Sequence, residues 1–207
     1  MMKRLLDLVV SITGLLLLSP IWGSTALLVK VKYGSPVLFK QERIGYQCNV
    51  FTVYKFRSMS DTKDDRGNLL PDSKRITKFG RFIRKTSIDE LPQLWNVIRG
   101  DMSLVGPRPL LVHYLPYYTS EENSRHSVKP GITGLAQISG RNRLTWDRKL
   151  AYDVEYVKKR SMKLDLIIIG KTILKVFKRE GMVEVQREMM LDLDIERQGK
   201  TVTSYNK

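Results

Sequence analysis

The chain has 207 residues, 42 % of them hydrophobic, and its 36 lysines and arginines outnumber 21 acidic residues, for a formal net charge of +15. This length and apolar content exclude a disordered polymer and favour one compact domain with its own core. One cysteine (Cys48) and two histidines exclude a disulfide framework and argue against histidine-based metal or triad chemistry, whereas the positive charge calls for an anionic partner.

The first predicted element is a membrane segment at residues 5–29, in which Asp7 is the only charged residue. A straight helix of this length would be roughly 38 Å long, enough to span a bilayer once. Pro20 interrupts the run, because proline lacks an N–H and clashes with the preceding turn, and the hydroxyl of Ser19 could bond to a freed carbonyl. Lysine and arginine residues flank both ends, which favours keeping both on the cytoplasmic side. We therefore favour a re-entrant helix–break–helix hairpin over a spanning helix.

Short apolar runs at residues 36–41 and 50–56 predict a small β-hairpin, and residues 60–73 predict a polar loop. Asp61, Asp64 and Asp65 in this loop could bind a cation or simply be solvated.

Beyond the polar loop, the sequence alternates predicted helices with loops. Helices are expected at residues 75–85 and 88–98, and residues 129–143 are expected to be mostly loop because they contain three glycines. Residues 151–180 return to helical periodicity, and the second part places apolar residues on one stripe beside lysines: Leu166, Ile169, Ile173, Val176 and Phe177. That helix could pack in the core or lie in the plane of an anionic membrane surface. From about Arg187 a loosely held polar tail is expected.

Asp89 and Glu90 are adjacent carboxylates in a strongly basic region. Glu90 could complete a capping box with Ser87, or the helix could begin later, at Pro92. An ionised aspartate among arginines is also a plausible nucleophile towards phosphorus, since the basic groups would neutralise an approaching phosphate. Nucleic-acid binding is disfavoured, because the basic residues lack interleaved aromatics and no DNA-binding motif is recognisable.

Four motifs occur together in order: Ser19-Pro20 in the apolar segment, YKFRSM (54–59), DELPQLWNVIRGDMSLVGPRP (89–109) and PGITGLAQISGRN (130–142). In this combination the chain resembles the bacterial sugar transferase family, the small monotopic phosphoglycosyl transferases, over nearly all of residues 1–180. The resemblance implies transfer of a sugar-1-phosphate from a UDP-sugar to a polyprenyl (undecaprenyl) phosphate, with release of UMP. It also implies Mg²⁺ as cofactor and a phosphosugar-aspartyl intermediate.

The resemblance implies roles for individual residues as well. Asp89 corresponds to the nucleophile and Glu90 to its partner carboxylate, and both are expected to bind the metal. Arg108 and Arg141 correspond to phosphate-binding positions, as do Lys55 and Arg84, for which ordinary surface charge is the alternative. Gly131 and Gly134 could let backbone amides approach a phosphate in a nucleotide loop, or could serve a turn that needs positive φ. Ser19 and Pro20 mark the break in the membrane hairpin.

The expected fold is α+β and predominantly helical, with a re-entrant hairpin at residues 1–33, a catalytic domain at residues 34–187 and a polar tail at residues 188–207. Interfacial amphipathic helices would surround a cytosol-facing site on the cytoplasmic face of the bacterial inner membrane. The expected partners are a UDP-sugar, undecaprenyl phosphate and anionic membrane lipids. Two other classes of function stay open: a membrane-bound basic scaffold, and a phosphohydrolase that uses Asp89.

Overall fold

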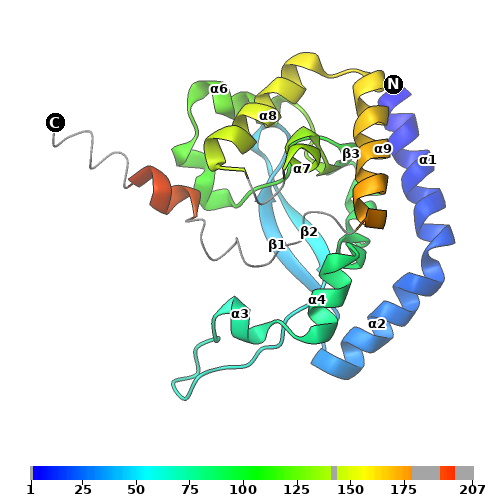
Figure 1. Cartoon of the computed structure of the whole chain (residues 1–207), viewed down its shortest axis with the longest axis vertical. Helices are drawn as coiled ribbons and strands as arrows, with labels where there is room; N and C mark the ends of the chain where they lie inside the picture. The colour runs from blue at the N-terminus through cyan, green and yellow to red at the C-terminus, as the bar shows by residue number, and fades with distance from the viewer. Residues whose placement is uncertain (1, 141–143, 179–191, 199–207) are drawn as a thin grey trace. The chain divides into compact units, whose positions relative to one another are not determined.

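The computed structural model describes residues 2–140, 144–178 and 192–198 (Figure 1). They form a mostly helical α+β fold, as predicted, with two small sheets where the sequence predicted only one β-hairpin. The α-helices are α1 (Met2–Leu17), α2 (Ser19–Tyr33), α3 (Asp72–Arg75), α4 (Lys78–Lys85), α5 (Gln93–Arg99), α6 (Ser120–Asn123), α7 (Leu135–Ser139), α8 (Trp146–Lys159) and α9 (Met162–Lys178). The 3-10 helices are η1 (Tyr46–Cys48), η2 (Ile88–Glu90), η3 (Val112–Tyr117) and η4 (Ser124–Ser127). The strands are β1 (Leu38–Ile44), β2 (Val50–Phe56), β3 (Ser103–Val105) and β4 (Gly131–Thr133).

The chain divides into two compact units. The first combines Met1–Gln41 with Thr52–Gly100, and the second combines Glu42–Phe51 with Asp101–Lys207. The sheet formed by β1 and β2 therefore has its base in the first unit and its tip in the second. Strand β2 has the predicted bounds, whereas β1 begins and ends slightly later than predicted.

The predicted helix–break–helix at the N-terminus is confirmed: the axes of α1 and α2 differ by 63° at the break (Figure 1). Pro20 lies in the first turn of α2, where its missing N–H costs no hydrogen bond. The hydroxyl of Ser19 donates to the carbonyl of Leu16 at 2.8 Å, as the sequence suggested. Among the described residues no single helix is long and apolar enough to cross a membrane, but α1 and α2 together meet that requirement of length and composition.

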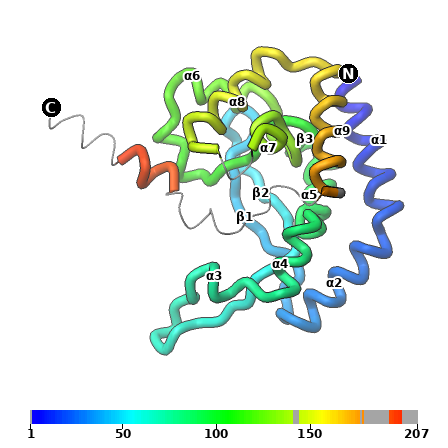
Figure 2. The backbone as a smooth tube through the Cα atoms, viewed as in Figure 1, coloured from blue at the N-terminus to red at the C-terminus, as the bar shows by residue number. Residues whose placement is uncertain are grey.

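Helix α1 packs against α5, and both helices can be followed in Figure 2. The side of α1 that is buried is polar. Asp7 and Ser11 are buried on α1, and the guanidinium of Arg4 donates to the carbonyls of Val97 (2.5 Å) and Ile98 (2.8 Å) in the last turn of α5. The opposite side of α1 is apolar and exposed, with Leu5, Val9, Ile12, Leu16 and Leu17 between 45 % and 74 % accessible. The helix is thus tied to the protein by polar contacts and offers its apolar side outward.

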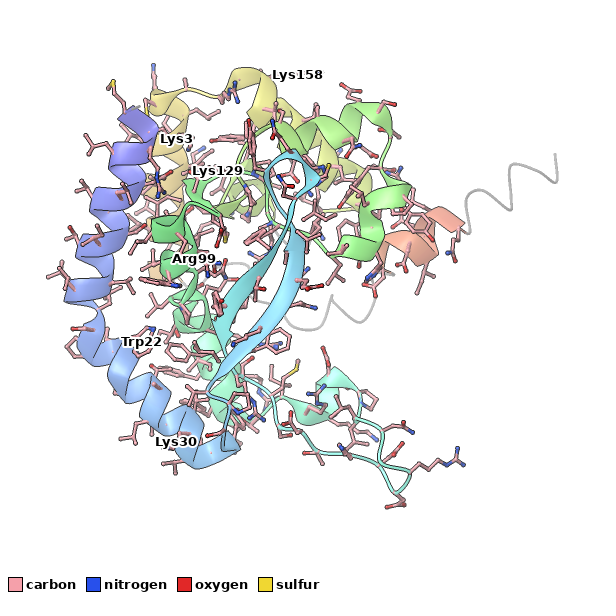
Figure 3. The ribbon with its side chains drawn as sticks, turned by 180° about the vertical axis from the view of Figure 1, so that it is seen from behind. Lys3, Trp22, Lys30, Arg99, Lys129 and Lys158 are labelled. Atoms are coloured by element: carbon pink, nitrogen blue, oxygen red, sulfur yellow. The ribbon has the colours of Figure 1, made fainter. Side chains whose placement is uncertain are left out.

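Helix α2 covers the apolar core of the first unit. Val29, Phe56 and Ile83 form this core, and the ring of Trp22, labelled in Figure 3, lies 5.5 Å from that of Phe56. Because Phe56 ends β2 and Ile83 belongs to α4, the core fixes α2 against the strand and helix that carry two predicted site residues, Lys55 and Arg84.

In the second unit, β3 pairs in parallel with β4, and α9 packs on both strands. The prediction of loop at residues 129–143 is wrong for β4 and α7. Residues 131–133 instead form β4, whose backbone groups pair with β3. Residues 135–139 form α7, which buries Ala136 and Gln137.

Of the two alternatives for α9, packing of its apolar stripe in the core fails at Leu166 and Ile173. Ile168 and Asp165 are buried on α9, whereas Leu166 and Ile173 are 55 % and 50 % exposed. The buried edge is set by a polar contact that periodicity does not reveal, since the hydroxyl of Tyr156 donates to Asp165 at 2.7 Å. The other alternative, a helix that lies in the membrane surface, requires such exposed apolar side chains.

Candidate active site

The predicted site residues fall in both units. Lys55, Arg84, Asp89 and Glu90 belong to the first, and Arg108, Gly131 and Gly134 to the second. Arg141 lies outside the described residues.

Asp89 and Glu90 lie in η2, a single 3-10 turn that Ser87 introduces with a left-handed backbone (φ 56°, ψ 16°). The predicted capping box is wrong, because the Ser87 side chain caps nothing and the following helix, α5, begins at Gln93. Pro92 is the N-cap of α5, close to the alternative start. The turn buries Asp89, of which only 8 % is exposed.

Lys55 pairs with Glu90 in the first unit. Its ammonium Nζ lies 2.7 Å from Glu90 Oε1, with the two side chains 25 % and 18 % exposed. Water is partly excluded from this pair, so its attraction is screened less than that of a surface pair. The lysine offsets the negative charge beside Asp89, which an anionic substrate would otherwise meet.

Asn96, a residue that no sequence motif singled out, holds α5 against β2. It is fully buried, its Nδ2 donates to the Thr52 carbonyl at 2.7 Å, and its Oδ1 accepts from the Tyr54 N–H at 3.3 Å. These two hydrogen bonds fix the position of β2, which carries Lys55, relative to α5, which follows Glu90. The sequence offered one sign of this role: a buried polar residue needs hydrogen-bond partners, and Asn96 lies among the apolar residues of a predicted helix.

Two residues of the YKFRSM motif (54–59), Arg57 and Ser58, make further contacts in the first unit. The Nε of Arg84 donates to the Ser58 hydroxyl at 2.7 Å, and α4, which carries Arg84, packs against η2. Arg57 pairs with Asp61 at 2.6 Å, so this carboxylate serves an ion pair.

The remaining acidic residues of the loop give no metal site. Asp64 accepts backbone N–H groups of Arg66 and Asn68 and thereby shapes the loop. Throughout the described part of the chain, no cluster of three or more histidine, cysteine, aspartate or glutamate residues is arranged to bind a metal.

In the second unit, Arg108 is exposed between the buried residues Pro107 and Pro109. Its backbone is held in place by the guanidinium of Arg125, whose Nη2 donates to the Arg108 carbonyl at 2.6 Å. The prolines restrict φ on both sides, so the Arg108 side chain projects from a rigid segment.

Gly131 and Gly134 serve a close approach between backbones. A Cβ on Gly131 would lie 2.1 Å from the N of Gly106, and a Cβ on Gly134 would lie 2.2 Å from the O of Gly106. Neither glycine has positive φ, so the turn considered as an alternative does not explain them. The N–H of Gly131 donates to the Pro107 carbonyl at 2.9 Å, which ties the two motifs together.

Arg125 is itself buried and pairs with Asp153, and no sequence motif singled out either residue. Nη2 and Nε of Arg125 donate to Asp153 Oδ2 at 2.8 and 3.1 Å, with the side chains 1 % and 5 % exposed. Burial raises the pKa of Asp153, and Arg125 opposes that shift. Burial and the neighbouring Arg125 charge lower the pKa of His126 to about 4, so this imidazole is neutral at pH 7 and its Nδ1 can donate to Asn123.

Comparison with known proteins bears on this arrangement. Residues 1–179 match the family described as bacterial sugar transferase. The chain is 56 % identical over 180 residues to an uncharacterized sugar transferase, EpsL, of Bacillus subtilis, a match that covers 87 % of this chain and 89 % of that protein. It is 44 % identical over 196 residues to the galactosyl transferase CpsE of Streptococcus agalactiae, covering 86 % of this chain and 43 % of that protein. It is 39 % identical over 198 residues to the undecaprenyl-phosphate galactose phosphotransferase of Salmonella typhimurium, covering 87 % and 41 %. The chain thus spans most of the first relative but less than half the length of the other two.

Proposed function

The chain belongs to the bacterial sugar transferase family, and on that premise we propose that it transfers a sugar-1-phosphate from a UDP-sugar to undecaprenyl phosphate. The observation that carries the proposal is the buried carboxylate of Asp89 next to a glutamate paired with Lys55. A relative named as an undecaprenyl-phosphate galactose phosphotransferase supports both the lipid acceptor and the class of reaction.

In the first step, a carboxylate oxygen of Asp89 attacks the β-phosphorus of the UDP-sugar. The bond between this phosphorus and the bridging oxygen breaks, UMP leaves with the electron pair, and the phosphosugar stays on Asp89. Lys55 lowers the repulsion between the carboxylates and the diphosphate by partly neutralising Glu90.

In the second step, an oxygen of undecaprenyl phosphate attacks the same phosphorus. The acyl-phosphate bond breaks, the Asp89 carboxylate is regenerated, and the product is an undecaprenyl diphosphate sugar. We assign phosphate binding to Arg108, whose rigid flanks suit a fixed cation, and to Arg84 and Arg141.

We propose that Asp89 and Glu90 would hold a magnesium ion. Mg²⁺ often binds through one or two carboxylates together with substrate phosphates and water, and two adjacent carboxylates supply such a donor set. A bound Mg²⁺ would neutralise charge on the diphosphate. Lys55 would keep Glu90 in place.

We further propose that α1 and α2 form a re-entrant hairpin that keeps the enzyme on the cytoplasmic face of the inner membrane. Exposed apolar side chains on both helices and the bend at Pro20 support this topology. Lysines near both ends, Lys3 and Lys30, support the cytoplasmic placement (Figure 3). Anionic lipids would attract these basic flanks, and the lipid acceptor would present its phosphate at headgroup level.

The variant Asp89→Asn tests the nucleophile. We expect turnover to fall by about three orders of magnitude or more, with membrane association unchanged, because the amide cannot form the acyl phosphate. The control is Asp65→Asn, which alters an exposed loop carboxylate and should keep wild-type turnover.

Wild-type protein given radiolabelled UDP-sugar without lipid should release one equivalent of UMP and retain the labelled phosphosugar. UMP release only after lipid addition would contradict the two-step route. Free sugar phosphate as the product would instead indicate the phosphohydrolase.

A further inference from the structure

The C-terminal residues 192–198 lie beyond the family match, which ends at residue 179, and they dock on the second unit. The expectation of a loosely held tail is wrong for this segment. Leu193 is fully buried in a cluster with Tyr114, Trp146 and Leu150. The polar appearance of the tail concealed this anchor, because the apolar residues Leu191, Leu193 and Ile195 alternate with acidic residues and show no helical period.

Polar contacts flank the leucine on both sides. The hydroxyl of Tyr114 donates to Asp192 Oδ1 at 2.9 Å. Arg197 Nη2 donates to Glu122 Oε1 at 2.7 Å and to Asp147 Oδ1 at 2.9 Å, so one guanidinium joins α6 to α8. Burial alone would raise the pKa of Glu122, but the hydrogen bonds from Arg197 and from the Thr119 N–H outweigh it and lower that pKa.

The docked segment contacts the chain that follows the Pro-Arg-Pro motif. Tyr114 and Tyr117 belong to η3, and Gln198 Nε2 donates to the Tyr117 hydroxyl at 2.6 Å. Leu110 and Leu111, directly after that motif, pack against the cluster that contains Leu193. The backbone of Arg108 is therefore held by Arg125. The residues that follow Arg108 in the chain are contacted by residues 192–198.

We propose that residues 192–198 act as a C-terminal clip, a positioning element that docks on η3, α6 and α8 and holds the Arg108 segment in its substrate-binding conformation. Leu193 and Arg197 are its two anchors. The docking stands on its own contacts, whereas the effect on substrate binding rests on the proposed function.

Leu193→Asp in the full chain removes the apolar anchor. Ile195→Asp is the matched control, since Ile195 lies in the same helical turn (residues 193–198) and is 52 % exposed. Hydrogen exchange of peptides covering residues 106–117 and 192–198 is measured in detergent micelles without substrate. We expect exchange in both peptides to accelerate by at least about tenfold in Leu193→Asp and to stay at the wild-type rate in Ile195→Asp. Unchanged exchange in residues 192–198 would overturn the docking, and unchanged exchange in residues 106–117 alone would overturn the coupling to Arg108.

A charge swap separates direct contact from general destabilisation. Arg197→Glu should release the clip, because it places a third carboxylate beside Glu122 and Asp147. Adding Glu122→Arg should restore protection, because the new guanidinium can pair both with the carboxylate introduced at position 197 and with Asp147. Failure of the swap to restore any protection would argue against the Arg197 anchor.

The kinetic test uses the same variants. Leu193→Asp should raise the KM for the UDP-sugar several-fold with kcat nearly unchanged, as expected when binding is lost equally in ground and transition states. Equal KM values for wild type and Leu193→Asp would overturn the positioning role. A wild-type chain with no transferase activity would instead count against the proposed function and leave the exchange result intact.

Discussion

At the scale of single residues, Arg125 forms a deeply buried ion pair. It is 2 % exposed, and it bonds both to the buried Asp153 and to the Arg108 carbonyl. The paired residues lie 28 positions apart in sequence, and neither belongs to a periodic pattern, so only the folded chain reveals the pair. The same holds for Asn96, whose two partners lie on a strand more than forty residues earlier.

Arg125→Met should destabilise the protein by about 3–5 kcal/mol, because it leaves the carboxylate of Asp153 buried without its cation. Denaturant unfolding would measure the loss. Lys158→Met is the control: its pair with Glu121 is 65 % and 69 % exposed, and its removal should cost less than about 1 kcal/mol. A double variant, Arg125→Met with Asp153→Leu, should recover much of the stability, and no recovery would count against a buried-charge penalty.

The position of the proposed catalytic pair could be read from the sequence, whereas its surroundings could be predicted only in part. Asp89 and Glu90 are adjacent in sequence, and their resemblance to a known motif singled them out. Their surroundings depend on long-range contacts: Lys55 meets Glu90 across 35 positions. Local sequence rules favoured Ser87 as a helix cap. In the structure Ser87 has a left-handed backbone conformation and its side chain caps no helix.

At the scale of elements, the clearest success is the break between α1 and α2. A proline within an apolar run has a strong local effect, so it needs no tertiary context to be recognised. The failures are β4, α7 and the buried edge of α9, each of which is defined by partners elsewhere in the second unit. Glycine-rich sequence predicts loop, but at Gly131 and Gly134 the glycines allow backbones to approach each other.

Pro20→Ala should straighten the bend and drive the N-terminal segment towards spanning the membrane. A continuous helix over residues 2–33 would be about 48 Å long, more than a bilayer core requires. Single cysteines at Met2 and Ser35, in a Cys48→Ser background, report the topology through an impermeant thiol reagent added to intact cells. Neither should be labelled in the parent, and one should become labelled in Pro20→Ala.

Gly23→Ala is the matched control for that substitution, because outside the adjacent backbone of α2 no atom lies within 4 Å of the added methyl group. It should leave both cysteines protected. Labelling of either cysteine in the parent protein would show that the hairpin does not return to the side it entered from.

At the scale of the whole molecule, acidification should lower stability well before carboxylates in general titrate. The pKa of His126 is lowered to about 4, whereas an unfolded histidine binds a proton below about 6.5. The unfolded state therefore takes up more protons between these values, and this part of the stability is present above pH 6.5 and lost as the pH falls towards 4. Glu122, with its lowered pKa, adds a further loss at lower pH.

Unfolding free energies measured between pH 7.5 and pH 4.5 should fall by about 2–3 kcal/mol. His126→Gln should flatten this dependence, whereas His113→Gln, at a side chain that is 56 % exposed, should keep it. An equally steep profile in His126→Gln would assign the acid sensitivity to other groups.

The contact between Arg4 and the last carbonyls of α5 has a consequence for the lipid environment. Helix α5 begins three residues after Glu90, so the helix that would lie among acyl chains is hydrogen-bonded to the helix that follows the proposed catalytic carboxylates. A bilayer that is too thin or too thick shifts or tilts an embedded helix. Acyl-chain length would then become a variable of turnover, and the enzyme should work best in membranes whose hydrophobic thickness matches its own.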